Sequence, residues 1–97
     1  KAVQIADGIT TISDQAFMNC ASLTAVHIPE GVTSIGTSAF NGCKSLKNIK
    51  FPNALTVIGE NAFADCGELE SVQAPEYLKD QVEKAFRDMD SLEILYY

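Results

Sequence analysis

LTAVHIPEGVTSIGTSAFNGCKS (residues 23–45) and LKNIKFPNALTVIGENAFADCGE (residues 46–68) lie end to end and share one pattern. The pattern continues in both directions without insertion or deletion, because phenylalanine recurs at a constant interval, at Phe17, Phe40, Phe63 and Phe86. Self-similarity at a fixed period of this length is typical of a solenoid, in which each repeat buries its apolar face against the next. The chain is therefore predicted to be one domain of four units, at residues 1–22, 23–45, 46–68 and 69–97.

Each unit contains one stretch with the alternation of a half-buried strand. Residues 26–28 read Val-His-Ile and precede Pro29, and residues 49–51 read Ile-Lys-Phe and precede Pro52. Successive side chains of a strand point to opposite faces, so the apolar members should face the interior and the polar members the surface. Proline cannot donate to a sheet ladder, which places it at the end of each strand.

The fourth unit departs from the pattern. Residues 76–89 carry apolar side chains at helical spacing behind Pro75, which predicts an amphipathic helix. Gln81 stands where the other units have isoleucine, and Met89 replaces the repeated cysteine. These changes predict a helical cap with a polar exterior at the C-terminal end. The N-terminal end has no such cap, and its first strand is predicted to be an open sheet edge.

Two outward positions of each strand change from unit to unit while the inward positions hardly vary. This variation is expected if packing fixes the interior and the outer face is free to suit a ligand; drift on a solvent-exposed surface is the alternative explanation. One column ends at Tyr96 and its neighbour at Ile94, so Tyr97 is predicted to be core. The candidate ligand-binding residues are His27, Asn48, Lys50, Ser71, Gln73 and Tyr96.

The sequence offers no pattern for catalysis, metal binding or a cofactor. His27 is the only histidine, and its expected neighbour Lys50 would repel a cation. Cys20, Cys43 and Cys66 recur in phase, which predicts a stack of reduced structural thiols, since side chains in register resist the torsion that a disulfide prefers. Paired acids, a nucleophile elbow and a phosphate loop are missing, so we predict that the chain is not an enzyme.

The charge distribution argues against nucleic acid as a partner. The net charge is −6, with +1 in residues 1–50 and −7 in residues 51–97, whereas phosphate binding needs clustered Lys and Arg. No stretch of about 18 apolar residues is present, so direct membrane insertion is not expected. The chain opens on Lys1 already in repeat phase, which suggests a piece of a longer protein.

The pattern L-x-x-[VI]-x-[IF]-P-x-x-[VL]-T-x-I-G-x-x-A-F-x-x-C-x-x-L resembles the BspA-like class of leucine-rich repeats over essentially the whole chain. The resemblance implies an α/β fold, a right-handed solenoid whose parallel strands line a concave face. It also implies a cell-surface or secreted protein whose repeats serve adhesion and protein recognition, with no catalytic residues and no cofactor.

Two functional hypotheses follow. The first is a non-enzymatic adhesion or recognition module of a surface or secreted protein, which binds a protein, glycoprotein or glycan through the concave strand face. The alternative is a structural spacer or assembly repeat with no ligand of its own, which forms a weak homodimer through its open N-terminal edge.

Overall fold

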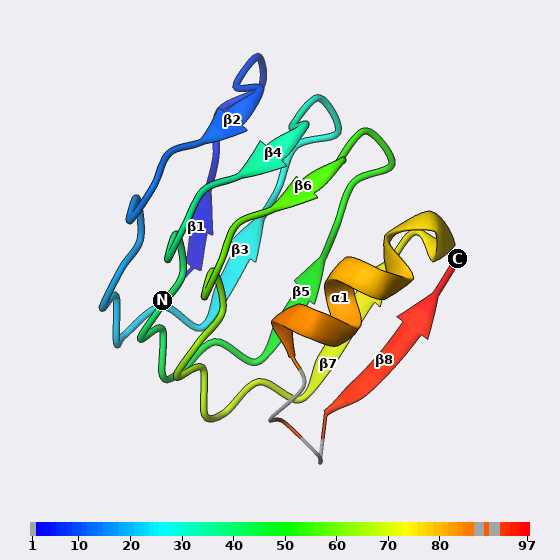
Figure 1. Ribbon diagram of the computed structural model, residues 1–97. Coiled ribbons are helices and arrows are strands. Elements are labelled where there is room, and N and C mark those ends of the chain that lie inside the picture. The colour runs from blue at the N-terminus through cyan, green and yellow to red at the C-terminus, as the bar shows by residue number, and fades with distance from the viewer. Residues whose placement is uncertain (1, 87–88, 90–91) are drawn as a thin grey trace.

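The computed structural model describes residues 2–86, 89 and 92–97, with side chains from Ile5 onward. The chain winds as stacked coils, with one sheet on each of two sides and a helix over the last coil (Figure 1). In chain order the elements are β1 (Ala2–Gln4), β2 (Thr11–Ile12), β3 (Ala25–His27), β4 (Ser34–Ile35), β5 (Asn48–Lys50), β6 (Val57–Ile58), β7 (Ser71–Ala74), a 3₁₀ turn η1 (Glu76–Leu78), α1 (Lys79–Ala85) and β8 (Glu93–Tyr96).

Both sheets are parallel, whereas the family resemblance implied parallel strands for one face only. The five-stranded sheet has the order β1-β3-β5-β7-β8, and the three-stranded sheet has the order β2-β4-β6. Ala25 pairs with Asn48 and Asn48 with Ser71, so the register advances by one full repeat from coil to coil. Each repeat of the sequence is therefore one turn of the stack.

The phenylalanine column forms the centre of the core. The rings of Phe17, Phe40 and Phe63 stack nearly parallel, with successive centroids 5.1 Å apart. Phe86 continues the column at 5.2 Å from Phe63 but is tilted by 33°, because it follows a helix rather than a turn of the regular type. Phe40 and Phe63 are fully buried.

The cysteines form the predicted stack of thiols. Cys43 and Cys66 are buried, and each donates to a carbonyl oxygen of the preceding coil, Phe17 O and Phe40 O, at 3.2 Å. Cys20 lies in the first coil and is only partly buried. All three are free thiols.

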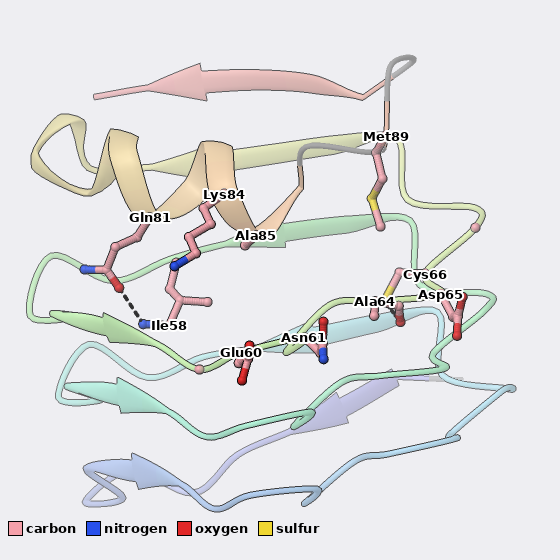
Figure 2. Close-up of a pocket in the computed structure, with 12 residues that line it drawn as sticks. Ile58, Glu60, Asn61, Ala64, Asp65, Cys66, Gln81, Lys84, Ala85 and Met89 are labelled. Carbon is pink, nitrogen blue, oxygen red and sulfur yellow. Dashed lines mark hydrogen bonds between the residues drawn. The ribbon is translucent and has the colours of Figure 1, made fainter.

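The C-terminal helix is present but shorter than residues 76–89. It begins as the 3₁₀ turn η1 and ends at Ala85, with Leu78, Val82 and Phe86 turned into the core. Gln81 closes the free edge of the three-stranded sheet: its side-chain Oε1 accepts from Ile58 N at 2.9 Å (Figure 2), and its Nε2 donates to Thr56 O at 2.7 Å.

The predicted placement of Tyr96 on the outer face is wrong. The register between β7 and β8 falls one position short of the repeat, so Gln73 pairs with Leu95 and the buried Ala74 with Tyr96. The repeat phase is kept past the helix, since Phe86 stacks on Phe63 and Leu92 N donates to Met89 O as Leu69 N does to Cys66 O. The slip therefore arises where the chain enters β8. A slip of one residue moves every side chain of a strand to the opposite face.

Candidate binding surface on the five-stranded sheet

The outer face of the five-stranded sheet presents the predicted residues of β3, β5 and β7 together. His27, Asn48, Lys50 and Gln73 are exposed, and Ser71 is partly exposed. Asn48 lies beside Ser71 and Lys50 beside Gln73, and the Ser71 hydroxyl donates to Asn48 Oδ1. Five of the six predicted residues therefore form one continuous surface, which we call the sheet face.

Leu95 and Glu93 occupy the places predicted for Tyr96 and Ile94. Tyr96 instead turns toward α1, with Lys79 Nζ 5.9 Å from its ring centroid. Burial raises the pKa of the Tyr96 hydroxyl, and the carboxylates of Glu83 and Asp80 add to this effect. Because its hydroxyl is buried, with no hydrogen-bond partner among the residues that the structure describes, Tyr96 does not belong to the sheet face.

Tyr97 is the exposed member of the terminal tyrosine pair, whereas the sequence predicted that Tyr97 is core and Tyr96 is on the surface. Its side chain is 46% exposed, and Lys50 Nζ lies 5.7 Å from its ring centroid. Burial of the hydroxyl raises the pKa of Tyr97, and the charges of Glu30 and Tyr77 raise this pKa further. Sequence reasoning missed this contact because it depends on the register of β8.

Tyr77 is a second residue that the sequence did not single out. It follows Pro75 outside the repeat pattern and is 61% exposed. Its hydroxyl hydrogen-bonds to the carbonyl oxygens of Asn53 and Leu55. The only signal in the sequence was a tyrosine on a segment otherwise predicted to be a polar cap.

The charges on the sheet face are sparse. Lys47 forms an ion pair with Glu68 at 3.0 Å just before β5, and hydrogen bonding to Glu68 raises the pKa of Lys47. Lys50, in contrast, has no carboxylate partner in the part of the chain that the structure describes. Its ammonium group and the imidazole of His27 are therefore available to a ligand.

Metal binding finds no support in the geometry. Within residues 2–86, 89 and 92–97, no three His, Cys, Asp or Glu side chains are grouped so as to hold an ion. A groove of about 800 Å³ lies between α1 and the third coil, away from the sheet face (Figure 2). Glu60, Asp65 and Lys84 line it, and the amide of Gln81 at its edge is already bonded to backbone.

No helix in the described part of the chain is both long enough and apolar enough to cross a bilayer.

Comparison with known proteins agrees with this geometry. The BspA-type leucine-rich repeat region, in six copies, matches residues 1–97. A leucine-rich repeat protein from Bacteroides ovatus is 29% identical, with a TM-score of 0.71 over 100% of this chain and 30% of that protein. A leucine-rich cell-surface protein from Faecalibacterium prausnitzii is 27% identical, with a TM-score of 0.69 over 99% of this chain and 31% of that protein.

The chain thus spans less than a third of the length of each of these two structures. No curated protein matches it. The match over every residue, together with parallel strands that pair one full repeat apart, shows that this chain belongs to the BspA-type leucine-rich repeat family.

Proposed function

We propose that the chain is a non-enzymatic protein- or glycan-binding module of a cell-surface or secreted protein, and that it binds through the sheet face. Leucine-rich repeats are generally interaction modules, and solenoids use extended concave surfaces for binding. We take the sheet face as the concave side of a right-handed solenoid. The contact residues are His27, Asn48, Lys50, Ser71 and Gln73, extended by Leu95 and Tyr97.

The contrast between the two sides of the sheet carries this proposal. On the inner side, Ile49 and Val72 are buried and belong to a column of aliphatic residues. On the outer side, the column from His27 through Lys50 and Gln73 to Leu95 changes chemical type at every strand. A fixed interior beneath a varied, exposed face is the arrangement that recognition requires.

The test is capture from an extracellular-matrix and mucosal glycoprotein extract by the wild-type chain and by the double variant His27→Glu, Lys50→Glu. The matched control is Ser13→Glu, Lys44→Glu, which introduces the same change in charge at exposed positions away from the sheet face. We expect a partner that the first variant loses and the control retains. Equal capture by all three proteins would remove the sheet face as the binding site.

A second function, an assembly repeat without a ligand of its own, is favoured by the apolar side chains that the first coil exposes. Phe17 and Cys20 are only partly buried there, Ile9 and Met18 are 41% and 39% exposed, and β1 is an edge strand. Self-association through this end would give concentration-dependent dimers in sedimentation, which Gln4→Pro abolishes because proline cannot donate from the edge strand. A monomer at all concentrations would contradict this function.

A further inference from the structure

Three of the most exposed large apolar side chains gather at one corner of the molecule. Tyr77 and Leu95 are each 61% exposed, and Tyr97 is 46% exposed. The backbone joins the two tyrosines, because Glu76 N donates to Tyr97 O at 2.8 Å. In Figure 1 this corner lies where β8 ends, marked C, beside the turn between β7 and α1. It continues the sheet face at the carboxyl ends of its last strands.

Both tyrosine rings are held in place by their hydroxyl groups. The Tyr77 hydroxyl bonds to the carbonyl oxygens of Asn53 and Leu55, and the Tyr97 hydroxyl donates to Phe51 O. The same turn of the third coil therefore anchors both side chains. Since the hydroxyls are occupied and Lys50 lies over one face of Tyr97, the remaining ring faces are what a ligand meets, and side chains fixed in advance lose little entropy on binding.

The surroundings of these rings are polar. The face of an aromatic ring is the negative side of its quadrupole and attracts electropositive groups, as the position of Lys50 over Tyr97 illustrates. Gln73 is exposed between Lys50 and Leu95 and has no hydrogen-bond partner for its side chain in the described residues. The corner is thus an apolar platform bordered by hydrogen-bonding groups.

This combination fits a sugar ring better than a protein side chain. A pyranose carries partially positive C–H groups on one face and hydroxyls at its edge, which match an aromatic face and a polar border. An apolar anchor of a protein partner needs a pocket to fill, whereas the groove described above lies away from this corner. The charge of −7 in residues 51–97 opposes an anionic glycan.

We propose that Tyr77 and Tyr97 form a stacking platform for a neutral glycan, whose hydroxyls bind Lys50 and Gln73. This site rests on the proposed function and names its ligand class. Leu95 extends the apolar surface beside Tyr97, because alternate residues of a strand share a face.

The test uses an array of neutral oligosaccharides, their sialylated counterparts and a deglycosylated mucin polypeptide. The wild-type chain binds neutral glycans, Tyr77→Ala and Tyr97→Ala each weaken binding about tenfold, and Tyr97→Trp retains it. The matched control is Val57→Ala, which removes a side chain that is 50% exposed on the other sheet and leaves binding unchanged. Thermal unfolding of each variant verifies that it is folded.

A second measurement needs no variant. In an NMR titration of the wild-type chain with the tightest-binding oligosaccharide of the array, the ring signals of Tyr77 and Tyr97 shift. The signals of Tyr96, the third tyrosine of the chain, stay in place because its ring turns toward α1.

The outcomes separate the site from the function on which it rests. Glycan binding that leaves the signals of Tyr77 and Tyr97 unmoved overturns the platform. Binding to the deglycosylated polypeptide that depends on His27 and Lys50 but not on the tyrosines overturns the platform and leaves the proposed function standing. Binding to no component of the array overturns both.

Discussion

At the scale of single residues, cysteine and phenylalanine act as a pair across neighbouring coils. Each buried thiol donates to the phenylalanine carbonyl of the coil before it: Cys43 donates to Phe17 O and Cys66 to Phe40 O. The fixed spacing in the sequence was sufficient to predict that the thiols stack. The identity of the acceptor was not predictable, because it depends on how far one coil is offset from the next.

Because Cys66 is buried, the folded chain should lose stability as the pH rises above about 9. Its side chain is almost fully buried, and burial, with smaller effects of Cys43 and Asp65, raises the pKa of the thiol from the ordinary 9.0 to about 12. Below pH 9 the thiol is protonated in both states, whereas between pH 9 and 12 only the unfolded chain releases the proton, so stability falls as pH rises. From pH 8 to 10.5 the loss attributable to Cys66 is about 2 kcal/mol.

Urea unfolding of the wild-type chain and of Cys66→Ala, in reductant at both pH values, measures this difference. The other titrating groups are common to the two proteins, so their contributions to the loss of stability cancel when the two losses are compared. An identical loss in both would show that the thiol of Cys66 is already ionisable in the folded chain.

Glycine in the column of Gly36 and Gly59 lets neighbouring coils approach backbone to backbone. A Cβ added to Gly59 would lie 2.4 Å from the carbonyl carbon of Gly36, closer than real contacts allow. Gly59→Ala should therefore lower the free energy of unfolding by about 2–3 kcal/mol, as overpacked sites do.

Gly67 is the matched control, because a Cβ there would meet no atom within 4 Å. Gly67→Ala should leave stability unchanged or raise it by up to about 1 kcal/mol, through the unfolded state. Chemical denaturation gives the free energy of unfolding of Gly59→Ala and Gly67→Ala for comparison with the wild-type chain. Equal effects would mean that the close approach of the coils relaxes at little energetic cost.

At the scale of elements, the regular coils were predictable and the fourth coil was only partly so. The strands of the second and third units lie one residue earlier than residues 26–28 and 49–51, at Ala25–His27 and Asn48–Lys50, with the alternation of buried and exposed side chains as predicted. The helix was predicted from its apolar spacing, but its end at Ala85 and the shortened register of β8 were not. A repeat gives the position of a strand only while each coil keeps the same backbone path. The shift of one residue in the register of β8 places Tyr96 off the sheet face and Tyr97 on it.

Gln81 is the residue by which the helix replaces a strand. Its side-chain amide accepts from the N–H of Ile58 and donates to the carbonyl of Thr56. This one side chain therefore forms the hydrogen bonds that a neighbouring strand would otherwise form with the edge of β6. Gln81→Ala leaves both groups without their partner and should lower stability by about 1–3 kcal/mol.

Lys84→Ala, an exposed position of the same helix, serves as the control and should change stability by less than about 0.5 kcal/mol. Amide hydrogen exchange at Ile58 provides the direct readout, with faster exchange expected in Gln81→Ala alone. Unchanged protection of that amide would show that the side chain does not close the sheet.

At the scale of the whole molecule, the two ends of the stack differ. At the C-terminal end α1 covers the edge of β6, while β8 is the edge of the five-stranded sheet. At the N-terminal end Phe17 stacks on Phe40 alone among the aromatic rings of the described residues. Cys20 likewise lacks the phenylalanine carbonyl that Cys43 and Cys66 each have in the coil before. The sequence differs between the two ends in the same way, because Gln81 and Met89 depart from the repeat pattern in the last unit and nothing comparable does so in the first.

A further coil added to this end should therefore stabilise the whole stack. A copy of residues 23–46 placed before Lys1 keeps the phase of the repeat and supplies a phenylalanine to cover Phe17 and a carbonyl for Cys20. Because Phe17 is already partly buried, completing its burial should by itself raise the free energy of unfolding by about 1 kcal/mol, and the apolar contacts of the added coil add to this. Denaturation should also show a steeper dependence on urea, because more surface becomes buried.

The control adds the same segment with the phenylalanine, valines and isoleucines of the new coil replaced by serine, so that length changes without a core. Alkylation of the native proteins gives the local readout: Cys20 should react in the original chain and in the control, and resist in the extended chain. If the extended chain is no more stable and its Cys20 stays reactive, then the first coil does not offer the surface that the later coils share.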